Sequence, residues 1–417
     1  MTFCKLTRPR RFGLLALFLA LSVPALSAQA APRKPVADTE VLERLPWRAG
    51  DTSARELAAL HSAMTAAATD PAPAAELAQR YFDLAMARGD PRYVGYAEAV
   101  VARFGEPLPA SLRSLRGLLR QYRHDFAGAL EDFAGALALD PDWAAAHAWR
   151  AAIYLVQADY AAAQQECDAL RRLGRSTLQG GCAGLLQAYT GQLEAGYRSL
   201  QLALATTSDV DKRLWLLTRL GEVAAWRGQT AQAEAHFREA LGLGRDDGYL
   251  LAAWGDFLLD TGQPAEVIRQ LAGWEASDSL LLRLAEAGAA LKRPDASRLA
   301  QLLDERFAAA RLRGDTTPRA EEARYRLRLR GDAAEALRLA GENYRVQREP
   351  RDARILLEAA IAAQDFVAAQ PVRDWLRRSG FEDARLRRLG QQSCTAASPC
   401  EVAPAPVRRE LPDGIRR

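Results

Sequence analysis

Four of the five cysteines have a spacing that suggests chemistry. Cys167 and Cys182 are 15 positions apart, and Cys394 and Cys400 are six apart. In an oxidising compartment this even number favours disulfides, which we expect to join Cys167 to Cys182 and Cys394 to Cys400. Metal binding is the alternative, but no histidine lies near Cys394 or Cys400 in sequence, so zinc would need ligands from elsewhere. We predict two disulfides and no metal site.

No pattern in the chain predicts catalysis. Glycine-rich phosphate loops, zinc-protease helices and nucleophile elbows are absent from the sequence. The four histidines are scattered: His61, His124, His147 and His236. Acid pairs such as Glu321 and Glu322 are usual on the solvated faces of charged helices. We therefore expect no catalytic residues and no cofactor. The alternative is an enzyme subunit whose acids are assembled from distant segments.

The first 30 residues have the pattern of an export signal. A basic start is followed by an apolar run over residues 12–23, and Pro24 then precedes the small residues Ala28 and Ala30 of a cleavage site. The apolar run is shorter than the roughly 20 residues that span a bilayer. We expect cleavage after Ala30 and a periplasmic location. An uncleaved anchor that associates the protein with the membrane or envelope is the alternative.

The charge of the chain does not indicate nucleic-acid binding. It contains 56 basic and 52 acidic residues, and four basic but no acidic residues lie among the first 30. Cleavage after Ala30 leaves 52 of each sign, so the exported protein has no net charge. Because a basic excess is what attracts nucleic acid, we expect none as a partner.

A pattern of small and aromatic residues returns about every 34 positions. Its clearest copy, residues 217–241, contains Gly221, Gly228, Ala233, Phe237 and Ala240. A second copy has Gly117, Ala129, Phe133, Ala136 and Pro141 at matching places. This period is typical of stacked helix–turn–helix units rather than of a compact catalytic domain. The units are expected to begin near residues 75, 110, 144, 177, 214, 248, 281, 317 and 351.

The pattern resembles the tetratricopeptide repeat (TPR) family, which has small residues at the eighth, twentieth and twenty-seventh places and an aromatic between the last two. The resemblance covers residues 56–385. It implies an all-α fold, an α-solenoid (superhelix) of stacked antiparallel helix pairs. Residues 31–55 are then a linker, and residues 386–417 are a proline-rich tail with a Cys394–Cys400 loop near its start.

The repeat register makes local predictions. Small residues such as Gly221 allow the two helices of a unit to approach closely, and Phe237 fills the space toward the next unit. Cys167 and Cys182 lie at equal distances from the turn between two helices, so antiparallel packing would bring them face to face. Residues 323–331 alternate with period two but occupy the place of a first helix, and we predict a helix there.

In this family the first helices line an inner groove. The register places these residues on it: Tyr122, Tyr189, Trp215, Glu222, Trp226, Tyr249, Asp256 and Asp260. Aromatic rings beside carboxylates suit an extended peptide or an amphipathic helix. The resemblance therefore implies a non-catalytic protein–protein interaction scaffold in the bacterial cell envelope that binds a protein or peptide partner.

Two alternatives to partner binding by the groove are open. One is a structural or polysaccharide-handling envelope protein whose inner surface packs mostly against itself. The other is that an arginine-rich run binds an anionic partner. The same run could instead form a solvated face whose charge is balanced by Glu321 and Glu322. Its members are Arg319, Arg324, Arg326, Arg328 and Arg330.

Overall fold

The computed structural model describes residue 37 and residues 52–394. The chain divides into a part that ends at Thr52 and a part that begins at Ser53, and the fold described here is that of the second part. The expected export signal and cleavage site lie outside the described residues, as do most of the linker and the tail from residue 395 onward. Within residues 52–394 the secondary structure is entirely helical.

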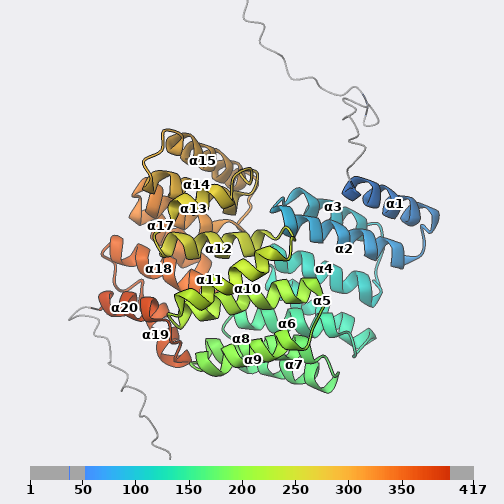
Figure 1. Cartoon of the computed structure of the whole chain (residues 1–417). Helices are drawn as coiled ribbons and strands as arrows, with labels where there is room; N and C mark the ends of the chain where they lie inside the picture. Colours follow the sequence, from blue (N-terminus) through green and yellow to red (C-terminus); the bar gives the residue numbers. More distant parts are fainter. Residues whose placement is uncertain (1–36, 38–51, 395–417) are drawn as a thin grey trace, which may run out of the picture. The chain divides into compact units, whose positions relative to one another are not determined.

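The helices follow one another in antiparallel pairs (Figure 1). The first helices of the pairs are α2 (Pro71–Arg88), α4 (Ala110–Tyr122), α6 (Ala144–Val156), α8 (Ser176–Tyr189), α10 (Val210–Trp226), α12 (Gly248–Asp260), α14 (Asp278–Ala290), α16 (Arg319–Tyr325) and α18 (Pro350–Ala362). The second helices are α3 (Arg92–Val101), α5 (Phe126–Leu139), α7 (Tyr160–Arg172), α9 (Leu193–Ala205), α11 (Thr230–Gly242), α13 (Pro264–Gln270), α15 (Ala296–Leu312), α17 (Ala333–Tyr344) and α19 (Gln370–Ser379). Helix α1 (Thr52–Ala66) precedes this array, and α20 (Ala384–Gln392) follows it.

The observed helices confirm an all-α solenoid of TPR-like pairs. Each first helix begins within four residues of a unit start expected from the sequence. Each first helix also packs against its own second helix, and each one before α18 packs against the first helix of the next pair. The run 323–331 is helical as predicted, because α16 continues into the π-helix η1 (Arg326–Arg330).

A residue with left-handed backbone geometry ends the first helix of every described pair. Five of these residues are glycines, for which positive φ carries no steric penalty. They are Gly89, Gly191, Gly228, Gly262 and Gly331, with φ between 60° and 77°. The other four are His124, Ala158, Lys292 and Gln364, with φ between 52° and 60°. Several second helices then begin with an aspartate cap, such as Asp125, which accepts a hydrogen bond from Gly128 N at 3.1 Å.

Aromatic residues join the pairs into a continuous core. The ring of Phe237 lies over Gly221 of its own pair and contacts Trp254 and Phe257 of the next, with centroids 5.7 and 5.6 Å away. Trp254 is completely buried. This arrangement confirms the prediction that the aromatic place of a unit packs toward the following unit, and it shows that the same ring also rests on the glycine of its own unit.

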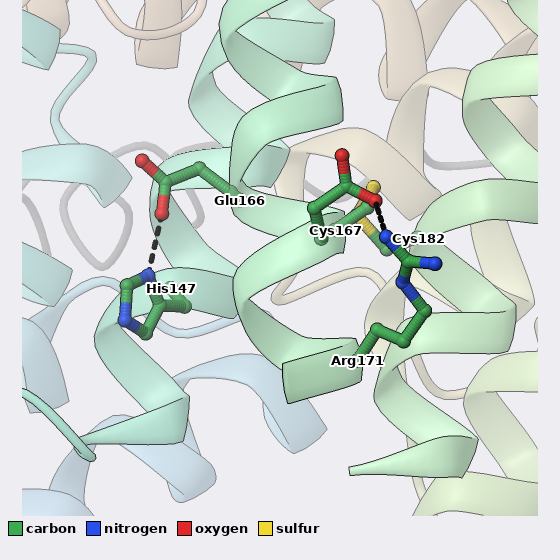
Figure 2. Close-up of a disulfide and its surroundings, with 6 residues drawn as sticks. His147, Glu166, Cys167, Arg171 and Cys182 are labelled. Atoms are coloured by element: carbon green, nitrogen blue, oxygen red, sulfur yellow. Dashed lines mark hydrogen bonds and ion pairs between the residues drawn. A yellow bond between two sulfur atoms is a disulfide. The ribbon is translucent and has the colours of Figure 1, made fainter. Parts of the chain in front are cut away.

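The structure contains the disulfide predicted between Cys167 and Cys182. It joins α7 to α8 with Cα atoms 5.6 Å apart (Figure 2). Close to it, His147 Nδ1 lies 2.6 Å from Glu166 Oε2, a hydrogen bond that links α6 to α7. Cys400 lies outside the described residues, and its pairing with Cys394 stays a prediction.

None of the helices in residues 52–394 combines the length and the apolar character needed to cross a bilayer. No group of three or more histidine, cysteine or acidic side chains among the described residues is arranged to hold a metal ion.

Removing the Cys167–Cys182 disulfide should lower the free energy of unfolding. A crosslink that closes a loop of this size lowers the entropy of the unfolded chain, which stabilises the folded state by about 3 kcal/mol. We expect the double variant Cys167→Ala/Cys182→Ala to unfold at a correspondingly lower urea concentration, and non-reduced digests of the exported wild type should contain the crosslinked peptide. Free thiols at both positions in exported protein would contradict the disulfide.

Gly221→Ala should destabilise the protein by about 1–3 kcal/mol, the usual range for overpacking a filled core. The added Cβ would lie 2.8 Å from two carbons of the Phe237 ring, which is itself packed on both sides. Gly242→Ala is the matched control, because nothing lies within 4 Å of its Cβ and it ends α11 without positive φ. Equal melting temperatures for the two variants would show that the Gly221–Phe237 contact is not restrictive.

Candidate partner-binding surface

The eight predicted groove residues all lie on first helices, but they are in contact with other parts of the same chain. Tyr122 is on α4, Tyr189 on α8, Trp215, Glu222 and Trp226 on α10, and Tyr249, Asp256 and Asp260 on α12. Six of them contact residues from the C-terminal third of the protein, directly or through one neighbour. We call the face of α8, α10 and α12 that carries these six residues the inner surface.

Tyr189 and Trp226 form an aromatic cluster with Phe381, which lies between α19 and α20. The Phe381 ring is 6.2 Å from the Tyr189 ring and 5.3 Å from the Trp226 ring, and Trp375 of α19 lies 5.3 Å from it on another side. Phe381 is 1% exposed and Tyr189 is 3% exposed. The rings of this cluster therefore belong to the hydrophobic core. Of the two predicted groove residues in it, Tyr189 is buried and Trp226 is half-buried.

Glu222 and Tyr249 belong to a polar cluster at the centre of the inner surface. The Tyr249 hydroxyl donates to Glu222 Oε1 at 2.6 Å, and Arg219 Nη1 lies 2.9 Å from Glu222 Oε2. The guanidinium groups of Arg219 and Arg351 lie over the Tyr249 ring, 4.4 and 5.7 Å from its centroid. Burial raises the pKa of Tyr249, so its hydroxyl stays protonated and acts as a donor. Arg351 comes from α18 and is half exposed, with 50% of its side chain accessible.

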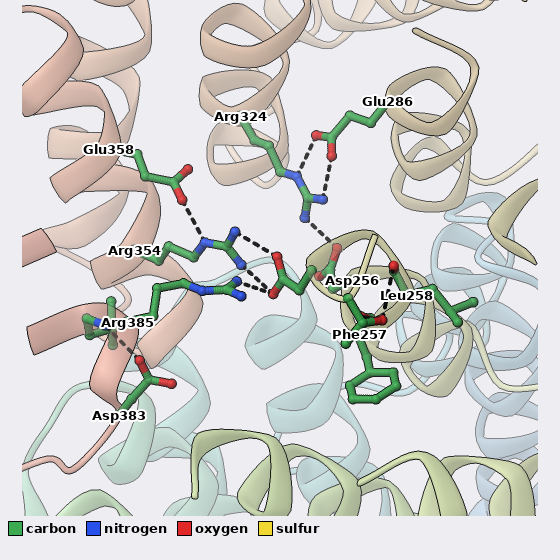
Figure 3. Close-up of polar contacts among 12 residues, drawn as sticks. Asp256, Phe257, Leu258, Glu286, Arg324, Arg354, Glu358, Asp383 and Arg385 are labelled. Carbon is green, nitrogen blue, oxygen red and sulfur yellow. Dashed lines mark hydrogen bonds and ion pairs between the residues drawn. The ribbon is translucent and has the colours of Figure 1, made fainter. Parts of the chain in front are cut away.

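Asp256 and Asp260 are the acids of an arginine–carboxylate network (Figure 3). Asp256 accepts hydrogen bonds from Arg283 at 3.0 and 2.7 Å and from Arg324 at 2.6 Å. Arg324 also donates to both carboxylate oxygens of Glu286, from Nε at 2.6 Å and from Nη2 at 2.7 Å. Although burial opposes ionisation, Arg283 and Arg324 lower the pKa of Asp256, so it is charged at neutral pH.

Asp260 forms ion pairs with arginines from α18 and α20. Arg354 of α18 donates to both of its carboxylate oxygens at 2.8 Å, and Arg385 of α20 forms a second ion pair with it. Figure 3 shows the side chains of Arg354 and Arg385 lying side by side and extending in the same direction. Bidentate arginine–carboxylate contacts fix orientation as well as adding energy. Asp260 therefore helps to hold the C-terminal helices in place.

Tyr122 and Trp215 lie apart from these clusters. Tyr122 is half-buried and meets the Phe82 ring edge-on at 6.3 Å, and burial raises its pKa to about 12. The Trp215 ring lies directly over Gly181 of α8, where there is no room for a Cβ. Both residues pack between neighbouring helix pairs.

The C-terminal part of the chain also contacts α6, α7 and α9, next to the inner surface. Arg348 N donates to Val156 O at 2.7 Å, and Trp375 Nε1 donates to Tyr160 at 2.7 Å. The backbone N–H of Leu193 donates to Glu382 at 2.8 Å. The chain itself is thus one occupant of the predicted groove, and binding of a separate partner by the eight residues stays a prediction.

Sequence reasoning did not identify the residues that supply these contacts. The main ones are Glu349, Arg351, Arg354, Phe381 and Arg385. The sequence contains one signal for these contacts: the last helices are rich in arginine, and α12 carries the aspartates that could pair with them. The arginine-rich run was noticed, and the structure pairs each of its members with an acid of the chain: Arg319 with Glu342, Arg324 with Asp256 and Glu286, Arg326 with Glu322, Arg328 with Glu358, and Arg330 with Asp304.

One buried acid has the perturbed pKa that is typical of functional sites. Burial raises the pKa of Asp352 to about 7, while Arg351 opposes this shift and Glu349 adds to it. Asp352 is 1% exposed, and its oxygens accept hydrogen bonds from Asn343 at 2.8 Å and from the backbone N–H of Glu349 at 3.1 Å. With both oxygens engaged at the start of α18 and no exposure, it acts as a helix cap rather than as an accessible acid.

Asp352→Asn should change how stability depends on pH. Because the folded pKa is raised from about 4 to about 7, the neutral acid stabilises the fold at low pH, and that contribution is lost as pH rises through 7. The free energy of unfolding of the wild type, relative to the variant, should fall by up to about 1.4 kcal/mol per pH unit across this window. Urea denaturation at pH 4.5–8 measures the slope.

The control for this experiment is Asp332→Asn, which alters an exposed aspartate cap that accepts from Glu335 N at 3.2 Å. Its stability should follow the wild-type curve with a constant offset. If Asp352→Asn also gave only a constant offset, Asp352 would not be the titrating group.

No family model and no curated protein sequence matches the chain. Among solved structures it is similar to the crystal structure of the P58(IPK) TPR domain, at 13% identity over 82% of this chain and 93% of that one, with a TM-score of 0.21. It is also similar to Naa15/Naa10 bound to HypK-THB, at 14% identity over 82% of this chain and 63% of that one, with a TM-score of 0.25. Because both TM-scores are below 0.5, the assignment as a solenoid of TPR-like pairs comes from the helices of this chain.

Proposed function

We propose that this protein is an exported, non-catalytic scaffold that binds a protein or peptide partner at the accessible part of its inner surface. The supporting observation is the Arg351–Tyr249 pair, in which a half-exposed guanidinium lies over a half-buried ring between Glu222 and Glu349. Arginine and tyrosine are the residue types that most often dominate protein interfaces.

The chemistry of this region favours a segment with both an acidic and an apolar side chain. Arg351 offers its guanidinium to an incoming carboxylate, and the Tyr249 ring beneath it offers apolar area. Although burial raises the pKa of Glu349, Arg351 and Arg219 outweigh that effect and lower it, so the acid is charged. Glu349 Oε2 accepts a hydrogen bond from Arg351 Nη2 at 2.9 Å, which orients the guanidinium. The negative charge of Glu349 also limits how strongly Arg351 attracts an acidic side chain of a partner.

The envelope location of this scaffold is part of the proposal. It is supported by the basic and apolar leader with its small-residue cleavage pattern at Ala28 and Ala30. It is also supported by the Cys167–Cys182 disulfide, since structural disulfides persist mainly in oxidising compartments such as the periplasm.

A structural envelope protein is the second candidate, because one observation specifically favours it. Phe381 packs against Trp226, and Arg354 and Arg385 bind Asp260, so side chains of the same chain occupy these positions of the inner surface. In that case the inner surface serves to hold the C-terminal helices, and no separate partner contacts Tyr249 or Arg351.

Arg351→Ala should weaken partner capture about tenfold, the effect of losing one interface hot spot of this kind. The full chain, tagged and expressed in its native bacterium, would be crosslinked in intact cells, recovered from the periplasmic fraction and analysed by mass spectrometry. The variant should recover about one tenth as much of the specific partner as the wild type, with helicity unchanged by circular dichroism.

Arg198→Ala is the matched control, since the Arg198 side chain is 62% exposed on the second helix α9 and forms an ion pair with Glu194 of the same helix. It should capture as much partner as the wild type. Equal capture by folded Arg351→Ala would place the partner elsewhere, and a wild type that recovers no specific protein would support the structural candidate.

A further inference from the structure

A cleft of about 770 Å³ opens between α17 and α19. Its apolar lining includes Leu337, Leu356 and Val367, and Val367 is 76% exposed. Gly341 of α17 also lines the cleft, and nothing lies within 4 Å of the position that a Cβ would take there. The cleft therefore comes close to the helix backbone, and it offers apolar surface to a narrow chain segment.

The two ends of the cleft carry opposite charges. Because α17 and α19 are each joined to α18 by a short turn, both run antiparallel to it, and their C-terminal ends lie at the same end of the cleft. Asp365, in the turn between α18 and α19, is exposed at the other end and has no basic partner in the described part of the chain. The C-terminal end is lined by three exposed arginines that form no ion pair with a described residue: Arg345, Arg348 and Arg378.

The other charged side chains that line the cleft are paired within the protein. Arg338 forms an ion pair with Glu342 at 2.6 Å, and Asp374 forms one with Arg377 at 2.8 Å. The charges that remain to attract an occupant are thus positive at one end of the cleft and negative at the other.

A segment of the same chain has the complementary order of charges. Residues 401–407 read Glu-Val-Ala-Pro-Ala-Pro-Val and are followed by Arg408 and Arg409. They lie outside the described part of the chain. The segment has an acid at its start, an apolar middle of small residues and two bases directly after it. Proline fixes φ near −65° and so favours an extended backbone, in which Glu401 and Arg408 are about 22 Å apart.

The cleft has a comparable length. Helix α17 has 12 residues and is therefore about 18 Å long, and Arg345 directly follows it. An extended segment of seven residues can thus place its acid at the arginine end while its bases reach the end that carries Asp365.

The described chain ends beside this cleft. The backbone oxygen of Ser393 accepts a hydrogen bond from Arg373 of α19 at 2.5 Å, and Ser393 is completely buried. The eight residues from Ser393 to Glu401 span at most about 26 Å, which exceeds the roughly 15 Å length of the ten-residue α19. If the predicted Cys394–Cys400 disulfide forms, its Cα atoms are about 6 Å apart, and Glu401 then follows close to Ser393.

We propose that residues 401–407 dock in the cleft between α17 and α19 of their own chain. Glu401 lies at the end that carries the three arginines, Arg408 and Arg409 lie toward Asp365, and the valines and prolines pack on the apolar lining. A segment tethered this close to its site has a high effective concentration, which favours it over a separate ligand of similar chemistry. The docked segment closes the cleft to other ligands until it leaves.

Elastase digestion of the full exported chain tests this docking. This protease cleaves after small apolar residues, and Val407 is followed by arginine rather than by proline. Mass spectrometry of the intact protein gives the rate of cleavage after Val407, which follows the population of undocked segments. Glu401→Arg adds a base beside the three arginines, and Arg378→Glu adds an acid beside Glu401, so each should raise this rate about tenfold. Combining the two substitutions should make cleavage slower than in Glu401→Arg alone.

Arg293→Glu is the control for the change of charge, because Arg293 is exposed between α14 and α15 and pairs with Asp295 at 2.9 Å. It should be cleaved at the wild-type rate. Dilution should not change the wild-type rate either, since docking within one chain does not depend on concentration. Cleavage of the wild type as fast as that of folded Glu401→Arg, or protection that is lost on dilution, would overturn the proposal.

Discussion

Each helix pair of this protein can bury its apolar side only against a neighbour, so the whole array depends on the chain reversing direction in the same way every time. That reversal requires one residue with positive φ at the end of each first helix. Where the residue is glycine the backbone adopts this geometry without strain. Where it is His124, Ala158, Lys292 or Gln364, the packing of the two helices must stabilise a conformation that is uncommon for such side chains.

This distribution explains how much of the fold could be predicted from the sequence. Gly191, Gly228 and Gly262 are visible as repeat signals, and the disulfide follows from the spacing of two cysteines around one turn. The turns at His124 and Gln364 have no such signal, although the backbone there is the same. The period of the apolar and small residues still places these units, because helix packing imposes it on every pair regardless of the turn residue.

The candidate site was predictable only in part, for a different reason. Helical periodicity identifies the face on which Tyr189, Tyr249 and Asp260 lie, since that depends on residues close together in sequence. It does not identify what faces them. Phe381 and Arg385 are more than a hundred positions away, and their approach depends on the accumulated rotation of many helix pairs, which no local pattern encodes.

Of the contacts that hold the C-terminal helices on the inner surface, some mainly stabilise the fold and others mainly fix the orientation of the helices. Burying Phe381 contributes about 1.5–3 kcal/mol, and the rings around it add specific geometry. The ion pairs of Asp260 are partly exposed, so solvent screens much of their attraction. Their bidentate geometry is then more important for setting the register of α18 and α20 than for stability.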